Sequence, residues 1–229
     1  MKTFKALSAL LSYPSAELIA AIPDIKQLLH DEGLLGPQRH RDLAPLLHEL
    51  ETGDLYDLQE RYVLLFDRSR TLSLNLFEHV HGESRDRGGA MVDLLETYRA
   101  GGFDLAGSEL PDHLPVVLEY VSTLPLDEAR SMLADAGHII AALADRLMKR
   151  GSSYAAVMST LVHLAEVDGD IPAELADVPD EDPEDLAALD AVWEETQVTF
   201  GPDPNAGCPV SRDILAKMDP RAGAAHPAE

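Results

Sequence analysis

The sequence predicts an all-α protein, and three observations lead to this prediction. Apolar residues recur at i, i+3, i+4 and i+7 over most of residues 1–166, which is the periodicity of amphipathic helices. Ser, Asp and Gly residues stand where such helices would begin and end. Only the segment 71–76 alternates like a strand, and a lone strand lacks a pairing partner. We therefore expect a single compact domain of about nine or ten helices around an aliphatic core.

Three helices are expected at the N-terminal end of the chain. Apolar residues three or four apart form one stripe over residues 4–11, which predicts the first helix. Ser15 can cap a second helix, and Pro23 is expected to stop it, because proline lacks the N–H of an inner helical turn. Asp24 can then cap a third helix that ends at Gly33, where a left-handed conformation is favoured.

Two further helices and one irregular connection follow. Leucines at i, i+3, i+4 and i+7 predict a helix over 43–50, and Gly53 ends it. Asp54 opens the next helix, which carries LYDLQERYVLLF to residue 66. Because the segment 71–76 has no partner strand, we interpret it as an irregular connection that enters a short helix.

Four more helices are expected after that connection. Ser84 can cap the first, and Pro115 is tolerable in the first turn of the second. Gly137 is the weak point of the third, since glycine destabilises a helix interior. The expected ranges are 84–101, 112–124, 125–150 and, from Ser152 or Ser153 onward, to residue 164.

Charge is distributed unevenly along the chain. Eighteen Lys and Arg residues oppose 41 Asp and Glu residues, which gives a net charge of −23. Residues 151–211 contain no Lys or Arg and 14 Asp or Glu. We therefore expect a helical domain at 1–166, an extended acidic linker at 167–182, one more helix at 183–199 and a loose, flexible tail at 200–229.

The composition excludes several classes of partner and site. An acidic surface repels nucleic acid and anionic lipid, whereas it attracts cationic partners. The single cysteine, Cys208, rules out a disulfide framework and a cysteine-based zinc or iron–sulfur site. No apolar run approaches ~18 residues, so we expect no insertion into a membrane and a cytoplasmic protein.

No catalytic signature stands out in the sequence. The motifs G-x-S-x-G, G-x-G-x-x-G and the P-loop are all missing. The densest polar cluster is EHVHGESRDR at residues 78–87. His79 and His81 are two residues apart, so on a helix they point to different faces, which disfavours a metal site. We interpret the cluster as a junction between helices, in which the arginines pair with local carboxylates, and we expect no cofactor and no enzymatic activity.

An acidic helical body with a polar junction suits peptide binding. A groove between helices can hold the apolar side chains of a guest segment, while an acidic rim attracts its lysines and arginines. Two alternatives remain open: an acidic helical adaptor for basic proteins, and a metal-dependent hydrolase that uses the cluster His79–Glu83. Similar affinity for many cationic peptides would indicate the adaptor, and stoichiometric zinc, iron or manganese would indicate the hydrolase.

Three segments of the chain resemble one known protein family. LQERYVLLFDRSRTLSLNLFEHVHGESRDRGGAMVDLL at 58–95 closely resembles the signature of the nitrate reductase molybdenum cofactor assembly chaperones, the delta-subunit family. LPDHLPVVLEYVSTL at 110–124 is similar to the family's second segment, and LSALLSYPSAEL at 7–18 looks like its opening helix and turn. The resemblance covers about residues 1–165. Gly89 is a small departure, since family members usually carry Gln at that position.

The resemblance implies an all-helical, cofactor-free cytoplasmic chaperone of the redox-enzyme maturation group. Such a protein binds the apo catalytic (alpha) subunit of a membrane-bound respiratory nitrate reductase, at least partly through the N-terminal segment of that subunit. It keeps the subunit competent for insertion of the molybdenum cofactor and delays docking to the membrane anchor. A homodimer is left open, because similar chaperones can exchange elements between copies.

The sequence and the resemblance together predict where a client peptide binds. We expect an apolar groove lined by the helices near 58–66 and 112–124, with the junction 77–87 as one rim. The N-terminal segment of the client would lie in it as an amphipathic helix. The expected binding residues are Tyr62, Phe66, Phe77, Glu78, His79, His81, Glu83, Arg85, Arg87, Asp112, His113, Leu114 and Glu119.

Overall fold

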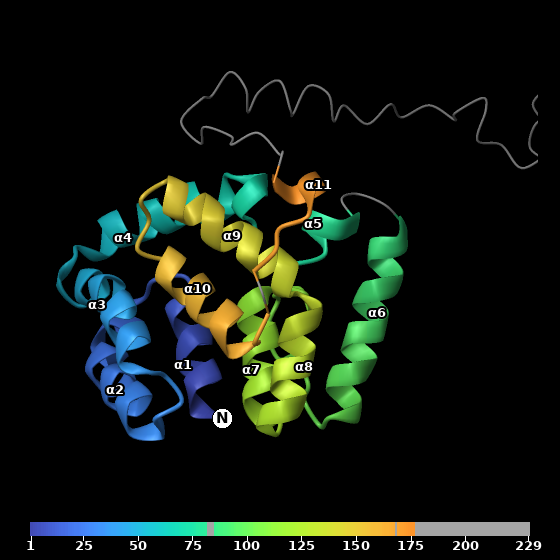
Figure 1. Cartoon of the computed structure of the whole chain (residues 1–229), viewed down its shortest axis with the longest axis horizontal. Helices are drawn as coiled ribbons and strands as arrows, with labels where there is room; N and C mark the ends of the chain where they lie inside the picture. Colours follow the sequence, from blue (N-terminus) through green and yellow to red (C-terminus); the bar gives the residue numbers. More distant parts are fainter. Residues whose placement is uncertain (82–84, 168, 177–229) are drawn as a thin grey trace, which may run out of the picture. The chain divides into compact units, whose positions relative to one another are not determined.

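The computed structural model describes residues 1–81, 85–167 and 169–176, all within one unit that spans Met1–Asp185. These residues form helices joined by short connections, with one isolated bridge and no strand among them (Figure 1). Nine of the α-helices in this part of the chain have eight residues or more, so the all-α prediction is confirmed. The predicted helix at 183–199, the tail at 200–229, and residues 168 and 177–182 of the predicted linker lie outside the described residues.

The first helix, α1 (Lys2–Leu10), forms the centre of the N-terminal half. The apolar stripe predicted at 4–11 is its buried face, and α1 packs between α2 (Ala16–Glu32) and α7 (Leu114–Thr123). Met1 supplies no side-chain cap to this helix. Instead the carboxylate of Glu32 accepts the backbone N–H groups of Lys2 and Thr3, which satisfies donors that a helix start leaves unpaired.

The prediction that Pro23 ends a helix is wrong. The helix α2 continues through Pro23 to Glu32, with the predicted cap by Ser15 and the left-handed Gly33 at its two ends. A proline removes one intrahelical hydrogen bond, but apolar residues on both sides of it pack into the same core. Burial of this continuous apolar face therefore outweighs the local cost of the proline.

The helices α3 (Pro37–Thr52) and α4 (Leu55–Tyr62) agree with the pattern of leucines and caps. All four leucines of the predicted stripe at 43–50 are buried in α3. The carboxylate of Asp54 accepts the backbone N–H of Tyr56 at 2.9 Å, so the predicted cap of α4 is confirmed.

After α4 the backbone is no longer α-helical: a wider helical turn comes first and a tighter one follows. A π-helix, η1 (Val63–Asp67), continues α4 directly, and a 3₁₀-helix, η2 (Arg70–Leu72), follows. The segment 71–76 leads irregularly into the single turn of α5 (Glu78–His81), as predicted. Because π-helical segments often occur at functional sites, η1 is a first pointer to where function lies.

The helix α6 (Arg85–Ala100) lies at one side of the bundle in Figure 1. Tyr98 near its end is fully buried, whereas Met91, Leu94 and Leu95 are only half-buried. The Tyr98 hydroxyl donates to the carbonyl of Pro111 at 2.7 Å. The C-terminal end of α6 is thus anchored in the core, while its middle is loosely covered.

The long helical run predicted from residue 125 to 150 divides at its weak point. It forms α8 (Leu126–Asp135) and α9 (Gly137–Lys149), and an added Cβ at Gly137 would lie 2.9 Å from methyl groups of Val167. The helix α10 (Ala155–Leu164) packs along α9, and the short α11 (Ala173–Ala176) also contacts α9. Within the described residues, no helix is both long enough and apolar enough to cross a bilayer.

Replacing either of two glycines in or beside α6 by alanine should change the free energy of unfolding, in opposite directions for the two positions. Nothing lies within 4 Å of a Cβ built on Gly89, so Gly89→Ala should raise the free energy of unfolding by about 0.5–1 kcal/mol through helix propensity. A Cβ on Gly101 would lie 2.7 Å from the Tyr120 hydroxyl oxygen and ring, so Gly101→Ala should lower it by about 1–2 kcal/mol. Urea unfolding measures both, and a shift of the same sign in the two variants would contradict this description.

Candidate functional site

Two pockets open on either side of the end of η1. The first, which we call the tyrosine pocket, has a volume of about 440 Å³. The second, the polar pocket, has a volume of about 420 Å³. Asp67, the last residue of η1, lines both of them. The tyrosine pocket is lined by Ser8, Ser12, Tyr13, Tyr62, Asp67, Glu109, His113, Pro115, Val116 and Glu119. The polar pocket is lined by Phe66, Asp67, Ser69, Arg70, Ser73, Asn75, Glu78 and Arg87.

Tyr62 is a buried residue in the lining of the tyrosine pocket, and a hydrogen bond holds it in position. It lies at the end of α4, and its hydroxyl donates to the carbonyl of Leu11 at 2.9 Å, which joins α4 to the end of α1. Burial raises the pKa of Tyr62, so its hydroxyl stays protonated. The ring of Tyr13 stands edge-on to it, with centroids 5.5 Å apart, and Tyr13 is 49% exposed. The pocket therefore offers a solvent-facing aromatic surface on a rigid base.

The lining of the tyrosine pocket is also acidic. Asp67, Glu109 and Glu119 are among its lining residues, and no Lys or Arg is. Burial lowers the pKa of His113, so this histidine is neutral near neutral pH and adds no positive charge. Burial raises the pKa of Asp67, His113 opposes this rise, and the nearby Glu109 adds to it. The pocket combines apolar surface with uncompensated negative charge, which suits an amphipathic cationic segment.

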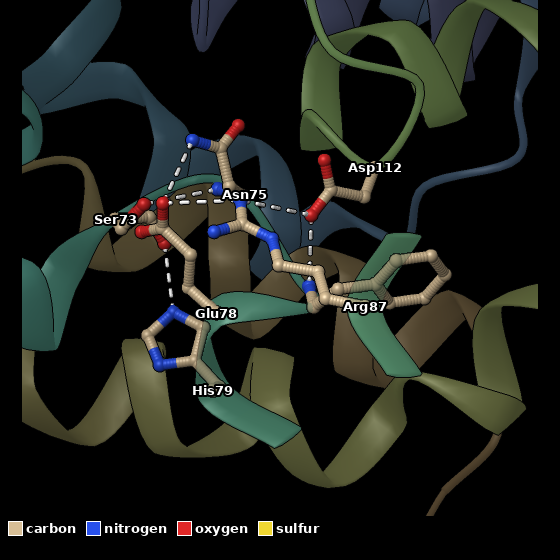
Figure 2. A network of polar contacts seen from close by, with 7 residues as sticks. Ser73, Asn75, Glu78, His79, Arg87 and Asp112 are labelled. Atoms are coloured by element: carbon tan, nitrogen blue, oxygen red, sulfur yellow. Dashed lines mark hydrogen bonds and ion pairs between the residues drawn. The ribbon is translucent and has the colours of Figure 1, made fainter. Parts of the chain in front are cut away.

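A network of polar contacts supports the polar pocket (Figure 2). One Glu78 carboxylate oxygen lies 3.1 Å from an Arg87 guanidinium nitrogen, which links α5 to α6. The same nitrogen lies 3.8 Å from a carboxylate oxygen of Asp112, which is fully buried. His79 contacts the carbonyl of Ser73 at 2.8 Å. The sequence interpretation of a helix junction with locally paired arginines is confirmed for Arg87.

Burial and neighbouring charges shift the pKa values of Asp112, Glu78 and His79. Burial raises the pKa of Asp112, although a backbone N–H and Arg87 oppose this. Burial alone would raise the pKa of Glu78 as well, but hydrogen bonds and the Arg87 guanidinium together bring it below its usual value. Burial lowers the pKa of His79. Arg87 is thus the positive charge on which both carboxylates depend.

The backbone joins the two pockets through a short bridge. Asn75 and His113 form an isolated antiparallel pair, in which the N–H of Leu76 donates to the carbonyl of Asp112 at 3.1 Å. The N–H of Leu114 donates to the carbonyl of Leu74 at 2.8 Å. The carboxylate of Asp112 also accepts the N–H of residue 77 at 3.0 Å. Segments 73–77 and 110–114, far apart in sequence, are therefore held side by side between the pockets.

The structure distributes the predicted site residues over several environments. Three line the tyrosine pocket: Tyr62, His113 and Glu119. Three line the polar pocket: Phe66, Glu78 and Arg87. Asp112 and Leu114 are fully buried in the connection between the pockets, and the half-buried Phe77, His79 and His81 lie on or beside α5. Glu83 and the side chain of Arg85 lie outside the described part of the chain.

Sequence reasoning missed seven lining residues of the tyrosine pocket, of which three carry an aromatic ring or a charge. Tyr13 lies in the turn after α1, Asp67 ends η1, and Glu109 precedes the bridge. Nothing in the sequence distinguishes Glu109 from the many other acidic residues of the chain. Nothing in the periodicity indicates the π-helix that places Asp67 between two pockets. In the described residues, no group of three or more His, Cys, Asp or Glu side chains is arranged to hold a metal ion.

The described residues form an all-α fold with two pockets that share Asp67 in their lining, and comparison with known proteins gives the family of the chain. The family model described as "Nitrate reductase delta subunit" matches residues 25–159. The nitrate reductase molybdenum cofactor assembly chaperone NarJ of Escherichia coli (strain K12) is 46% identical over 204 residues, which cover 88% of this chain and 86% of the relative. The chain belongs to the nitrate reductase delta-subunit family.

Two further relatives agree with this assignment. A probable nitrate reductase molybdenum cofactor assembly chaperone, NarW of Escherichia coli (strain K12), is 40% identical over 91% of this chain and 87% of its own length. A probable chaperone of the same description, NarJ of Bacillus subtilis (strain 168), is 36% identical over 72% of this chain and 88% of its own length. The family is one of assembly chaperones rather than catalysts, which sets the hydrolase alternative aside.

The charge network predicts a pH-dependent effect of removing Arg87. Arg87→Met should lower the free energy of unfolding by about 2–3 kcal/mol near neutral pH, because it leaves the buried Asp112 carboxylate without a cation. The folded-state pKa of Asp112 is already raised and would rise further, so acidification neutralises the group and relieves this penalty. The pKa of Glu78 is lowered, so the stability that Glu78 gains from Arg87 is also lost from the unaltered protein on acidification. The difference between the two proteins should therefore shrink as pH falls.

Urea unfolding at neutral and mildly acidic pH measures this difference. Arg99→Met is the matched control, because Arg99 lies on the same helix and is exposed. We expect little effect of the control at either pH. An Arg87→Met difference that stays constant across the pH range would contradict the network described here.

Proposed function

We propose that this protein is a system-specific chaperone for a membrane-bound respiratory nitrate reductase. It would bind the apo catalytic (alpha) subunit, support insertion of the molybdenum cofactor, and delay docking to the membrane. Family membership supports the chaperone role, and the tyrosine pocket, with its three carboxylates and exposed aromatic surface, is the observation that supports client binding. We expect it to act in the cytoplasm, as the resemblance implies.

We propose that the N-terminal segment of the client binds in the tyrosine pocket as an amphipathic helix. Apolar side chains of the segment would contact Tyr13, Tyr62 and Val116, while its lysines and arginines would face Glu109 and Glu119. The positive end of the helix dipole, at the N-terminus, also favours an acidic surface. A homodimer of the chaperone stays a prediction that the structure of one chain leaves untested.

The direct test of this function is capture of the immature client from its native cell. Chaperone purified under mild conditions should carry the large catalytic subunit in its cofactor-free form, and a deletion strain should lose nitrate respiration. Equal capture of unrelated basic proteins would instead indicate the acidic adaptor. Full nitrate respiration in the deletion strain would overturn the proposal.

A lysine in the tyrosine pocket should weaken client binding without unfolding the protein. Val116 lies half-buried on α7 and lines the pocket, so Val116→Lys would place a cation where we expect apolar contact. We expect at least about tenfold weaker binding of the client N-terminal peptide, measured by calorimetry. Val92→Lys is the control, since Val92 is 54% exposed on α6 and lines neither pocket. Equal affinity in the two variants, both correctly folded, would remove the pocket from the mechanism.

Association of the client peptide should slow markedly as the salt concentration rises. The chain carries a net charge of −23, and screening shortens to roughly 8 Å near physiological ionic strength, so electrostatic steering weakens. Stopped-flow measurement of the association rate constant over a salt series tests this. A rate constant that does not change with salt would leave only the apolar contacts to explain recognition.

A further inference from the structure

Asp67 lies where the tyrosine pocket and the polar pocket meet. Among the residues that line the tyrosine pocket and the polar pocket, it is the one common to both. It ends η1, so its backbone is fixed in the π-helix, whose last N–H…O bond runs from Arg68 to Val63 at 3.0 Å. A short side chain on such an ordered element loses little entropy when it binds a partner.

The carboxylate of Asp67 has no hydrogen-bond or ion-pair partner among the described residues. The acids Glu78 and Glu51, by contrast, lie 3.1 Å from Arg87 and 2.5 Å from Lys26. The titratable groups that act on Asp67 are His113 and Glu109. Burial keeps His113 neutral near neutral pH, and Glu109 carries a like charge, so neither supplies the missing cation.

The surroundings of Asp67 would complete a site for a cationic side chain. Tyr13 and Tyr62 line the tyrosine pocket beside it, and Tyr13 is 49% exposed. Aromatic faces attract lysine and arginine and cover their methylene stems. Glu109 is less suited to be the primary partner, because its side chain is 62% exposed and lies 3.7 Å from His113 Nδ1.

We propose that Asp67 is the specificity-determining residue of the groove, and that it pairs with one lysine or arginine of the client segment at the junction of the two pockets. This inference rests on the proposed function and deepens it. It follows that the client places apolar side chains in the tyrosine pocket on one side of that basic residue, and continues toward the polar pocket on the other. A positive charge supplied by the client would compensate the desolvation that raises the pKa of Asp67.

A double-mutant cycle tests this pairing. The probe is a synthetic peptide of about 15 residues, roughly four helical turns, from the N-terminus of the alpha subunit of the same organism's nitrate reductase. Each lysine or arginine of the peptide is replaced by methionine in turn, and each peptide is titrated against the full chain and against Asp67→Asn. We expect Asp67→Asn to weaken binding of the unaltered peptide about fivefold to tenfold. At one peptide position, the methionine replacement should weaken binding to the unaltered chain by a similar factor, but have little further effect with Asp67→Asn.

Two control variants make the outcome decisive. Asp93→Asn removes the same charge from an exposed position on α6 that lines neither pocket, and should change affinity less than twofold. Asp67→Glu keeps the charge and should retain the coupling at the same peptide position. Equal effects of Asp67→Asn and Asp93→Asn, or no coupling at any position, would overturn the role of Asp67 while leaving client binding intact. Failure of the unaltered chain to bind the peptide would overturn the proposed binding of the N-terminal segment itself.

Discussion

The bridge between segments 73–77 and 110–114 is the constraint on which the rest of the site depends. It has two backbone hydrogen bonds and a side-chain contact from Asp112 to the N–H of residue 77. The Arg87 guanidinium supplies the positive charge beside this buried carboxylate. Without the bridge, α5 and the wall of the polar pocket would be separate from α7 and the wall of the tyrosine pocket. A few polar contacts therefore set the geometry of the surface that we propose binds the client.

Helical periodicity predicted most of the fold, and the exceptions have local physical causes. The leucines of α3 and the caps at Ser15 and Asp54 agree with their patterns, because a repeating apolar face and a cap are local properties of the chain. The prediction at Pro23 was wrong because it considered the cost of one proline without the burial of apolar residues on both sides of it. The π-helix at 63–67 was missed for a different reason. The wider turn changes which side chains share a face, and nothing in an apolar run such as VLLF marks the change.

The site could be predicted only in outline. The resemblance indicated that the helices near 58–66 and 112–124 form a groove, and the tyrosine pocket has residues of both among its lining. It could not separate Tyr62, which lines the pocket, from Leu114, which is fully buried beside it. Asp67 and Glu109 were not named, because an acidic residue in a chain with 41 of them carries no signal until the structure places it. Which acids matter is a property of the tertiary fold, not of composition.

The distribution of charge explains how an acidic protein can be selective. A net charge of −23 attracts any cationic segment, so overall charge increases the rate of encounter but does not discriminate between clients. Discrimination requires a fixed charge next to a shaped apolar surface, because a mismatched segment then leaves either the carboxylate or the apolar side chains without a partner. The tyrosine pocket meets this requirement, because two aromatic rings and the carboxylate at the end of η1 are all part of its lining. Since contacts of this kind are individually weak, the surface that we propose for client binding would also release a client whose segment is no longer exposed.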